Sequence, residues 1–368
     1  MKQTKAAVTR GDGSFSIETI EVGTPGPGEV LVEIKASGIC HTDYDSMSWG
    51  KSLVMGHEGS GLVVETGSGV NSFQAGDAVL LNWAIPCGQC FQCSTGNLHI
   101  CEENSFCTGK GHGHAHADAC TFKKKTIARS FHLGTMSGYT IVKEAALVKQ
   151  SVDIPFTSSC IIGCGVMTGF GSAINSAQVK SGSSCAVIGC GGVGLNVIQG
   201  CKIAGAEKII AIDVNPQRLK IAEDFGATHF ILADKSEVNL NKSREKLLLL
   251  TAGRGADYAF ECTAVPELGA APLNLVRNAG MAVQVSGIEQ KISFDCELFE
   301  WNKIYLNPLY GNCNPQRDFQ KIQQYYQTGE LLLDELISKT YEIEDLGRAF
   351  EDMHAGRISK GVIVFNKG

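Results

Sequence analysis

Four cysteines in the first third of the chain have the spacing of a metal site. They are Cys87, Cys90, Cys93 and Cys101, which read C-x2-C-x2-C-x7-C. Four thiolates at such a spacing form a closed tetrahedral Zn²⁺ site, which has no position for a substrate. We therefore predict a structural zinc ion. Free thiols, or an iron–sulfur cluster, which also uses four cysteines, are the alternatives.

A second set of metal-ligating residue types is spread more widely along the chain. Cys40 precedes His57 by seventeen residues, and Cys164 stands between two glycines much later. Thiolate and imidazole ligands suit Zn²⁺, although a lone cysteine is more often a small buried apolar residue. Together the three predict a second zinc site, with Cys164 as the third protein ligand beside Cys40 and His57.

A glycine-rich motif occupies the middle of the chain. Residues 189–194 read G-C-G-G-V-G, a G-x-G-x-x-G pattern that follows the apolar run 185–188. A helical pattern covers 193–204, and a second apolar run, 209–212, ends at Asp213. This order of strand, glycine turn, helix, strand and acid predicts a dinucleotide site. A purely structural turn is the alternative, because the chain has 43 glycines.

Each residue of this motif has an expected task. Gly189 allows the tight turn, Gly191 lets backbone amides approach a pyrophosphate, and Gly194 allows close helix packing. The helix N-terminus carries partial positive charge. Asp213 can accept both ribose hydroxyls of an adenosine and would repel a 2′-phosphate, so we predict NAD. The coenzyme-binding residues expected from the motif are Gly189, Gly191, Gly192, Val193, Gly194 and Asp213.

Length and composition narrow the class of protein. A chain of 368 residues favours two domains. The net charge of −6, from 32 basic and 38 acidic residues, predicts neither nucleic acid nor an anionic membrane as a partner. Fifteen cysteines without an apolar N-terminal signal indicate a reducing compartment, the cytoplasm. The uncharged stretch 154–179 contains proline and several glycines, so we expect buried packing there and no membrane span.

The elements that must position these residues change along the chain. The opening predicts an all-β region of short alternating strands, with strand patterns at 5–9, 16–22, 30–36 and 138–147. From about 184 to 308, strand and helix patterns alternate, which predicts a mostly parallel sheet. The closing strand pattern at 361–365 resembles the opening region, and we expect it to fold back onto that region.

The most unusual segment is GHGHAHADAC at 111–120. His112, His114 and His116 alternate there, and three lysines follow at 123–125. An extra metal or anion site, or a recognition loop, is one interpretation. We favour a solvated loop of small and polar residues.

Across nearly its whole length the chain resembles the zinc-dependent medium-chain alcohol dehydrogenases. The resemblance rests on GICHTD (38–43), GHEGSG (56–61), the four-cysteine run, IIGCGVMTGFGSA (161–173) and GCGGVG…AID (189–213). It implies an α/β protein with a GroES-like β-rich catalytic domain at 1–165 and 309–368. A Rossmann coenzyme domain at 166–308 is inserted between these segments. It also implies a cytoplasmic homodimer or homotetramer with one catalytic and one structural zinc ion per chain.

The same resemblance suggests roles for individual residues. Cys40, His57 and Cys164 resemble the catalytic zinc ligands, Asp43 the partner that orients His57, and Thr42 the hydroxyl that takes the substrate proton. Asp45 stands where many members have the histidine that ends the proton relay. Further roles are a nearby carboxylate (Glu58), coenzyme contacts (His41, Thr168, Arg218, Lys360) and a substrate-pocket wall (Trp83, His132, Leu133).

The implied activity is NAD-dependent interconversion of an alcohol, primary and either aliphatic or aromatic, with its aldehyde or ketone. The stretch LNWAIPCGQC (81–90) resembles the branch that oxidises adducts of formaldehyde with a thiol such as glutathione or mycothiol. Such an anionic carrier needs a basic residue near the site, for which Lys110 and the lysines at 123–125 are candidates. A protein that binds NAD and zinc without catalysis is the third hypothesis.

Overall fold

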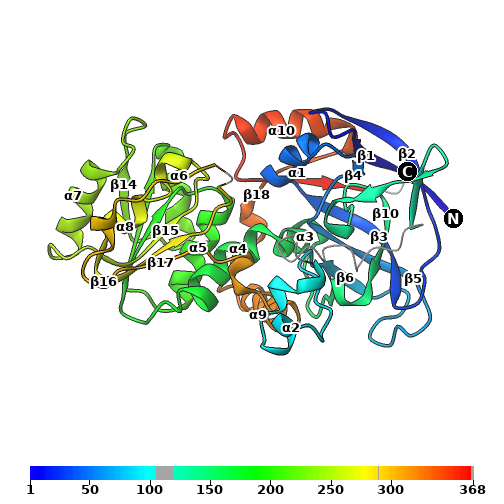
Figure 1. The fold of residues 1–368 in the computed structure, drawn as a ribbon, viewed down its shortest axis with the longest axis horizontal. Helices are drawn as coiled ribbons and strands as arrows, with labels where there is room; N and C mark the ends of the chain where they lie inside the picture. The colour runs from blue at the N-terminus through cyan, green and yellow to red at the C-terminus, as the bar shows by residue number, and fades with distance from the viewer. Residues whose placement is uncertain (105–118, 289, 366–368) are drawn as a thin grey trace. The chain divides into compact units, whose positions relative to one another are not determined.

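The computed structural model describes residues 1–104, 119–288 and 290–365. The histidine-rich segment, with His112, His114 and His116, and also Lys110, lie outside the described residues. The chain divides into two compact units (Figure 1). The first joins Met1–Cys164 with Asn314–Gly368, and the second is Gly165–Cys313.

The first unit contains two mainly antiparallel sheets. The seven-stranded sheet has β10 (Tyr139–Lys143) beside β3 and otherwise runs in the order β11 (Leu147–Lys149), β6 (Ala78–Leu81), β5 (Gly59–Thr66), β3 (Glu29–Gly38), β19 (Lys360–Val364), β18 (Ile337–Tyr341). The six-stranded sheet runs in the order β8 (Lys125–Thr126), β7 (Cys120–Phe122), β2 (Phe15–Val22), β1 (Lys2–Thr9), β4 (Leu53–Val54), β9 (Ala128–Arg129). The closing strand β19 pairs antiparallel with β3, so the tail folds back onto the opening region, as expected.

Strand β3 is the centre of this unit because both of its faces are buried. Successive side chains of a strand point to opposite faces. Val30, Val32 and Ile34 accordingly enter one hydrophobic cluster, and Leu31 enters another. The strand ends at Gly38, two residues before Cys40. Its carboxyl end therefore delivers the first metal-ligating residue from a well-packed support.

Short helices complete the first unit. They are α1 (His41–Asp45), α2 (Phe91–Ser94), α3 (Phe156–Cys160), α9 (Pro315–Gln327) and α10 (Leu346–His354). Helix α9 begins where Asn314 accepts a hydrogen bond from the Arg317 amide, with proline in the first position, a strong start signal. Helix α10 is tied to β18 through Asp352, whose carboxylate accepts from Lys339, Tyr341 and Arg357.

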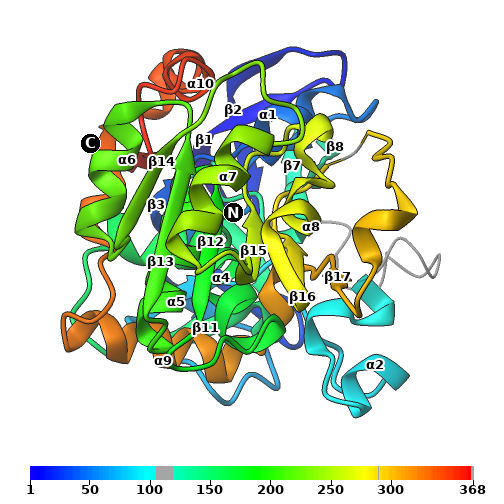
Figure 2. The same cartoon turned by 90° about the vertical axis from the view of Figure 1, so that its left-hand side faces the viewer.

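The second unit is a parallel sheet with helices, as the alternating pattern predicted. Figure 2 shows its strands side by side. Their order is β14 (His229–Leu232), β13 (Lys208–Asp213), β12 (Ser184–Ile188), β15 (Ala256–Glu261), β16 (Val276–Gln284), β17 (Ile304–Leu306). The chain runs outward from β12 in one direction and then outward from β15 in the other. Ligands of such sheets bind beyond the carboxyl ends of the strands where the order reverses, here at β12 and β15.

The helices of this unit are α4 (Gly165–Gly171), α5 (Gly192–Ile203), α6 (Pro216–Asp224), α7 (Asn241–Leu250) and α8 (Ala271–Leu275). Helices α4 and α5 pack with their backbones close together. A Cβ on Gly169 would overlap the Val193 carbonyl, and one on Gly200 would meet Ala173. Small residues at the crossing therefore allow α5 to pack closely against α4.

Two elements differ from the prediction. The strand expected over 138–147 is split into β10 and β11 by a turn at Glu144–Ala146, because β10 pairs with β3 whereas β11 pairs with β6. The apolar pattern at 166–176 predicts one helix. In the structure that helix ends as α4 at Gly171, and Ser172–Ser176 form a π-helical turn.

Among the described residues, no single helix combines the length and apolar character needed to cross a membrane. One bent pair, Phe156–Gly163 with Gly165–Ser176, meets that test on length and composition alone.

Candidate active site and metal centres

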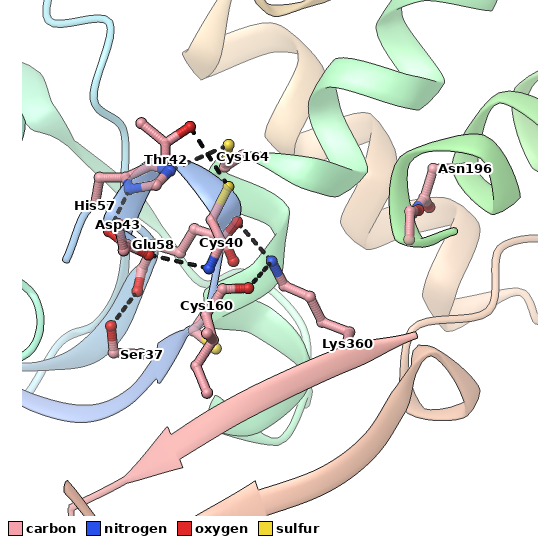
Figure 3. A network of polar contacts seen from close by, with 12 residues as sticks. Ser37, Cys40, Thr42, Asp43, His57, Glu58, Cys160, Cys164, Asn196 and Lys360 are labelled. Atoms are coloured by element: carbon pink, nitrogen blue, oxygen red, sulfur yellow. Dashed lines mark hydrogen bonds and ion pairs between the residues drawn. The ribbon is translucent and has the colours of Figure 1, made fainter. Parts of the chain in front are cut away.

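Cys40, His57 and Cys164 come together in the first unit, as shown in Figure 3. Cys40 is the residue before α1, His57 lies just before β5, and Cys164 follows a turn after α3. Their ligand atoms and a Glu58 oxygen all lie within 4.8 Å of one another. Nε2 of His57 is 3.3 Å from Sγ of Cys164. Two sulfurs, one imidazole nitrogen and one carboxylate oxygen thus converge on a single point.

A buried carboxylate holds two of these residues. Oδ1 of Asp43 lies 2.8 Å from Nδ1 of His57, and Oδ2 accepts the Cys40 backbone amide at 3.0 Å. Asp43 is fully buried. The bond to Nδ1 leaves Nε2 facing the cysteines, which is the orientation that a metal-ligating histidine needs.

Glycines around His57 are required by close contacts. Gly56 has φ of +97°, and a Cβ there would overlap the Met136 amide and the Thr135 hydroxyl. The segment at 135–136 bonds to the backbone of Met55 and Gly56. On the other side, a Cβ on Gly38 would overlap the Glu58 carboxylate. These glycines therefore let neighbouring segments approach the His57–Glu58 pair closely.

Lys360 lies beside the cluster. Its Nζ is 2.7 Å from Oε1 of Glu58 and 3.0 Å from the Ile39 carbonyl oxygen. The lysine side chain is 11% exposed and the glutamate 0%. Burial raises the pKa of Glu58 to about 7, although the Lys360 charge acts to lower it. The second oxygen, Oε2, is buried and has no hydrogen-bond partner among the described residues.

The charges of the cluster fit a bound cation. The Cys164 thiol bonds toward Cys40 and lowers the pKa of Cys40, and the same contact raises the pKa of Cys164. Burial acts to lower the pKa of His57, but the charge and hydrogen bond of Asp43, together with Cys40, outweigh it and raise that pKa well above its usual value. Two thiols cannot easily both ionise at this distance without a positive charge. A Zn²⁺ ion would supply it, and the S, N and O ligand types suit that metal.

The four-cysteine run forms a second cluster in the first unit. Cys87, Cys90, Cys93 and Cys101 place their sulfurs within 4.8 Å of one another. Backbone amides point at these sulfurs. The Cys90 amide bonds to Cys87 at 3.3 Å, and the Glu102 amide bonds to Cys90 at 3.4 Å.

Protonation differs among these thiols. Burial acts against the Cys90 thiolate, but backbone amides of Cys93 and Glu102 lower its pKa to about 6. Burial, and then the thiols of Cys90 and Cys101, raise the pKa of Cys93 to about 12. Four thiolates therefore need a bound cation to coexist. The group fits a tetrahedral Zn²⁺ ion with no open position.

The glycine turn of the second unit has room where a ligand would need it. Gly189 has φ of +88°, and a Cβ there would overlap Thr263. A Cβ on Gly194 would overlap the Gly189 carbonyl. Helix α5 can therefore lie this close to the turn only because residue 194 is a glycine. A Cβ on Gly191 would meet nothing within 4 Å, which leaves open space beside the N-terminus of α5. In the part of the chain that the structure describes, no side chain caps that helix end, so its amides can meet an anion.

Asp213 at the end of β13 is tied to the glycine turn. Its Oδ2 accepts the Cys190 amide at 2.7 Å, and its Oδ1 accepts the Asn215 amide at 2.8 Å. The residue is 6% exposed. The carboxylate is therefore held beside the turn in a defined orientation.

Two sequence comparisons identify the family. The family model for the alcohol dehydrogenase GroES-like domain matches residues 26–154, and that for zinc-binding dehydrogenases matches residues 192–321. The S-(hydroxymethyl)glutathione dehydrogenase of Paracoccus denitrificans is 34% identical over 382 residues, which cover 99% of this chain and 100% of the relative. The chain belongs to the zinc-dependent medium-chain alcohol dehydrogenase family.

Other members of this family agree in fold and extent. The class-3 alcohol dehydrogenase of Cereibacter sphaeroides is 34% identical over 381 residues, 99% of this chain and 100% of the relative. The crystal structure of benzyl alcohol dehydrogenase from Acinetobacter calcoaceticus has a TM-score of 0.89 at 28% identity, covering 100% of both chains. This dehydrogenase thus has the GroES-like and Rossmann-type fold that its motifs predicted.

The remaining sequence-predicted residues lie on both units of the dehydrogenase. Thr42 Oγ1 is 3.7 Å from the Cys40 sulfur, and Asp45 is exposed at the end of α1. The His41 ring contacts the ring of His354, with centroids 5.6 Å apart. Half-buried residues are Trp83, His132, Thr168 and Arg218, whereas Leu133 is fully buried in a hydrophobic cluster.

Sequence reasoning missed two residues beside the metal-ligating cluster. The Phe131 ring lies 5.1 Å from the His57 ring, and Trp49 packs on Phe131. Neither belongs to a motif. The one signal that could have indicated Phe131 is its position directly before His132, which the family resemblance places in the substrate-pocket wall.

We expect the two cysteine clusters to lose metal separately. Wild-type dehydrogenase should contain two zinc ions per chain, and Cys164→Ala should retain one while its melting temperature changes little. Cys93→Ala should also retain one zinc ion. Its melting temperature should be lower by several degrees, because the zinc ion that it lacks cross-links the loop of the four-cysteine run. Metal analysis and thermal unfolding measure both effects.

Cys160→Ala is the matched control, because Cys160 is buried but belongs to neither cluster. It should retain both zinc ions. Full zinc content in Cys164→Ala would contradict the assignment of the first cluster.

Proposed function

We propose that this dehydrogenase transfers a hydride between a primary alcohol, or its aldehyde, and NAD. The observation that carries the proposal is the buried Cys40–His57–Cys164 cluster, in which Asp43 holds the imidazole in the metal-ligating orientation. The glycine turn and Asp213 in the same chain supply a dinucleotide site of the expected form. The first unit is then the catalytic domain and the second the coenzyme domain.

The residues of the first unit divide the work between them. Cys40, His57 and Cys164 would hold a catalytic zinc ion, which supplies a Lewis acid that makes an alcohol oxygen more acidic. Asp43 keeps His57 in place through Nδ1. The Thr42 hydroxyl, next to the Cys40 sulfur, takes the proton of the substrate hydroxyl. The exposed Asp45, on the same helix, or a water molecule passes it to solvent.

Glu58 and Lys360 set the charge of this site. The ion pair places one positive charge next to two thiols and a carboxylate. The unpartnered Oε2 of Glu58 offers a further oxygen to the metal. The family resemblance implies coenzyme contacts for both Lys360 and His41. The buried contacts of Lys360 favour a role in holding Glu58, while the exposed His41 keeps the coenzyme role.

The coenzyme role of the second unit rests on its glycine turn. Amides at the start of α5, from Gly192 and Val193, would bind the pyrophosphate, and Arg218 and Thr168 would add contacts. NAD, when bound, supplies the hydride acceptor. Asp213 favours NAD over NADP because a carboxylate accepts ribose hydroxyls and repels a phosphate.

A second candidate is oxidation of a thiol–formaldehyde adduct. It is favoured by the name of the Paracoccus relative, S-(hydroxymethyl)glutathione dehydrogenase, whereas the Acinetobacter structure is named a benzyl alcohol dehydrogenase. A non-catalytic NAD- and zinc-binding protein is disfavoured, because Cys40, Thr42, Asp43, His57 and Cys164 are all in place.

An NADH absorbance screen tests the proposal. Zinc-loaded protein and NAD⁺ are assayed with primary and secondary alcohols, and with formaldehyde in the presence of glutathione. We expect turnover of primary alcohols, and its loss by several orders of magnitude in Cys164→Ala. Turnover of the adduct alone would favour the second candidate. Binding of NAD⁺ and zinc without any turnover would contradict both.

Coenzyme preference follows from Asp213. We expect Asp213→Gly to raise the ratio of kcat/KM for NADP⁺ to that for NAD⁺ by about tenfold or more, because the repelling charge is removed. Asp257→Asn is a control, since Asp257 pairs with Arg277 elsewhere in the unit. An unchanged ratio in Asp213→Gly would show that another residue selects the coenzyme.

We also infer a homo-oligomer formed through the edge of the parallel sheet, and a cytoplasmic location. Strand β17 is the last strand of that sheet. Around it, Trp301, Ile304 and Leu309 are 72%, 47% and 50% exposed. They form an apolar edge that a second copy could cover.

The cytoplasmic location is inferred from the cysteines. All described cysteines are free thiols, which suits a reducing compartment.

Light scattering with size-exclusion chromatography tests the oligomer. We expect Ile304→Lys to shift a wild-type dimer or tetramer toward a smaller species, because a charge in the interface must be desolvated. Phe230→Lys is the matched control, since Phe230 is exposed on the opposite edge strand β14. A wild-type monomer would exclude this interface.

A further inference from the structure

Three aromatic rings stand in contact beside the metal-ligating histidine. Phe131 is the middle ring. Trp49 and Trp83 each meet it edge to face, with centroids 5.8 Å and 5.3 Å away. We refer to Trp49, Phe131 and Trp83 as the aromatic wall. Its members come from three segments far apart in the sequence, so the grouping is a product of the fold.

Short local structures position the two tryptophans. Trp83 lies in a turn that Asn82 closes, since the buried Asn82 side chain bonds to both backbone groups of Ala84. Trp49 follows directly on α1 and the short turn Ser46–Ser48, the segment that carries Thr42 and Asp43.

Phe131 is held by a strained backbone. Phe131 and His132 have φ of +50° and +60°, in the left-handed region that residues other than glycine rarely adopt. The turn is closed by the Leu133 and Gly134 amides, which both donate to the Ser130 carbonyl. Strain of this kind persists only where the surroundings impose it, and it gathers at functional sites.

The wall borders the reacting centre of the proposed function. The Phe131 and His57 rings are 5.1 Å apart and tilted by 44°, and His57 Nε2 is one of the converging ligand atoms. A substrate whose oxygen is at this cluster has its carbon skeleton within reach of neighbouring side chains. On the His57 side, one of those side chains is the Phe131 ring, against which both tryptophans pack.

We propose that the aromatic wall selects alcohols that carry an aryl ring on the carbinol carbon, and that Phe131 is the specificity-determining residue. The inference rests on the proposed function and names its substrate class. A flat ring extends the edge-to-face packing already present among the three side chains. A thiol adduct that carries carboxylates would have to lose water against uncharged rings. Among the described residues, Lys51 contacts the wall, with its Nζ 5.9 Å from the centre of the exposed Trp49 ring.

The test compares benzyl alcohol with cyclohexylmethanol, which has a similar size but no aromatic ring. The measured quantity is the ratio of their kcat/KM values, in wild type, Phe131→Leu and Phe230→Leu. Intrinsic reactivity differs between the two alcohols but is the same for all three proteins. We expect Phe131→Leu to lower the ratio about tenfold or more, mainly through benzyl alcohol, and Phe230→Leu to leave it unchanged. Loss of zinc or of fold would lower both values together and would not move the ratio.

The outcomes separate this inference from the function on which it rests. An unchanged ratio in Phe131→Leu, or wild-type preference for S-hydroxymethylglutathione over free alcohols, would overturn the inference and leave a working dehydrogenase. Absence of turnover with every alcohol and adduct would overturn both.

Binding without turnover gives a second measurement. Two of the three tryptophans belong to the wall, so the Trp301→Phe protein reports on them alone. Benzyl alcohol should change its emission in a saturable way, at concentrations where cyclohexylmethanol and free N-acetyltryptophanamide show no such change. Equal responses to the two alcohols would contradict the proposal.

Discussion

The site depends on one buried carboxylate. Asp43 binds the imidazole of His57 with one oxygen and the backbone amide of Cys40 with the other. It therefore fixes the distance between two metal-ligating residues that come from different segments. A charge so deeply buried is tolerable only with such partners. The glycines at 38 and 56 serve the same end, because each removes a side chain that would push these segments apart.

Around this carboxylate the first unit balances several buried charges. Two thiols, an imidazole, the Glu58 carboxylate and the Lys360 ammonium share one small volume. Their pKa values move in opposite directions, with that of Cys40 lowered and those of Cys164 and Glu58 raised. Such a site is poised to take up a cation and to release protons as it does so.

The parts of the candidate sites that could be predicted from the sequence are those formed by short local motifs. The cysteine spacing, the glycine motif and the acid at Asp213 predicted their clusters because each motif needs particular residue types at fixed positions. The partner of Lys360 could not be predicted, since it depends on the pairing of β19 with β3. Phe131 was missed for a related reason. Its place is set by a left-handed turn whose residues, phenylalanine and histidine, give no sign of that conformation.

The contact between Lys360 and the Ile39 carbonyl has a consequence for how the protein is made. The carbonyl belongs to the segment that carries Cys40, near the start of the chain, whereas the lysine opens the closing strand. During synthesis the cysteine and histidine of the site leave the ribosome long before this lysine does. This contact of the site can therefore form only after all of the second unit has been synthesised, since Gly165–Cys313 lies between the two segments in the chain.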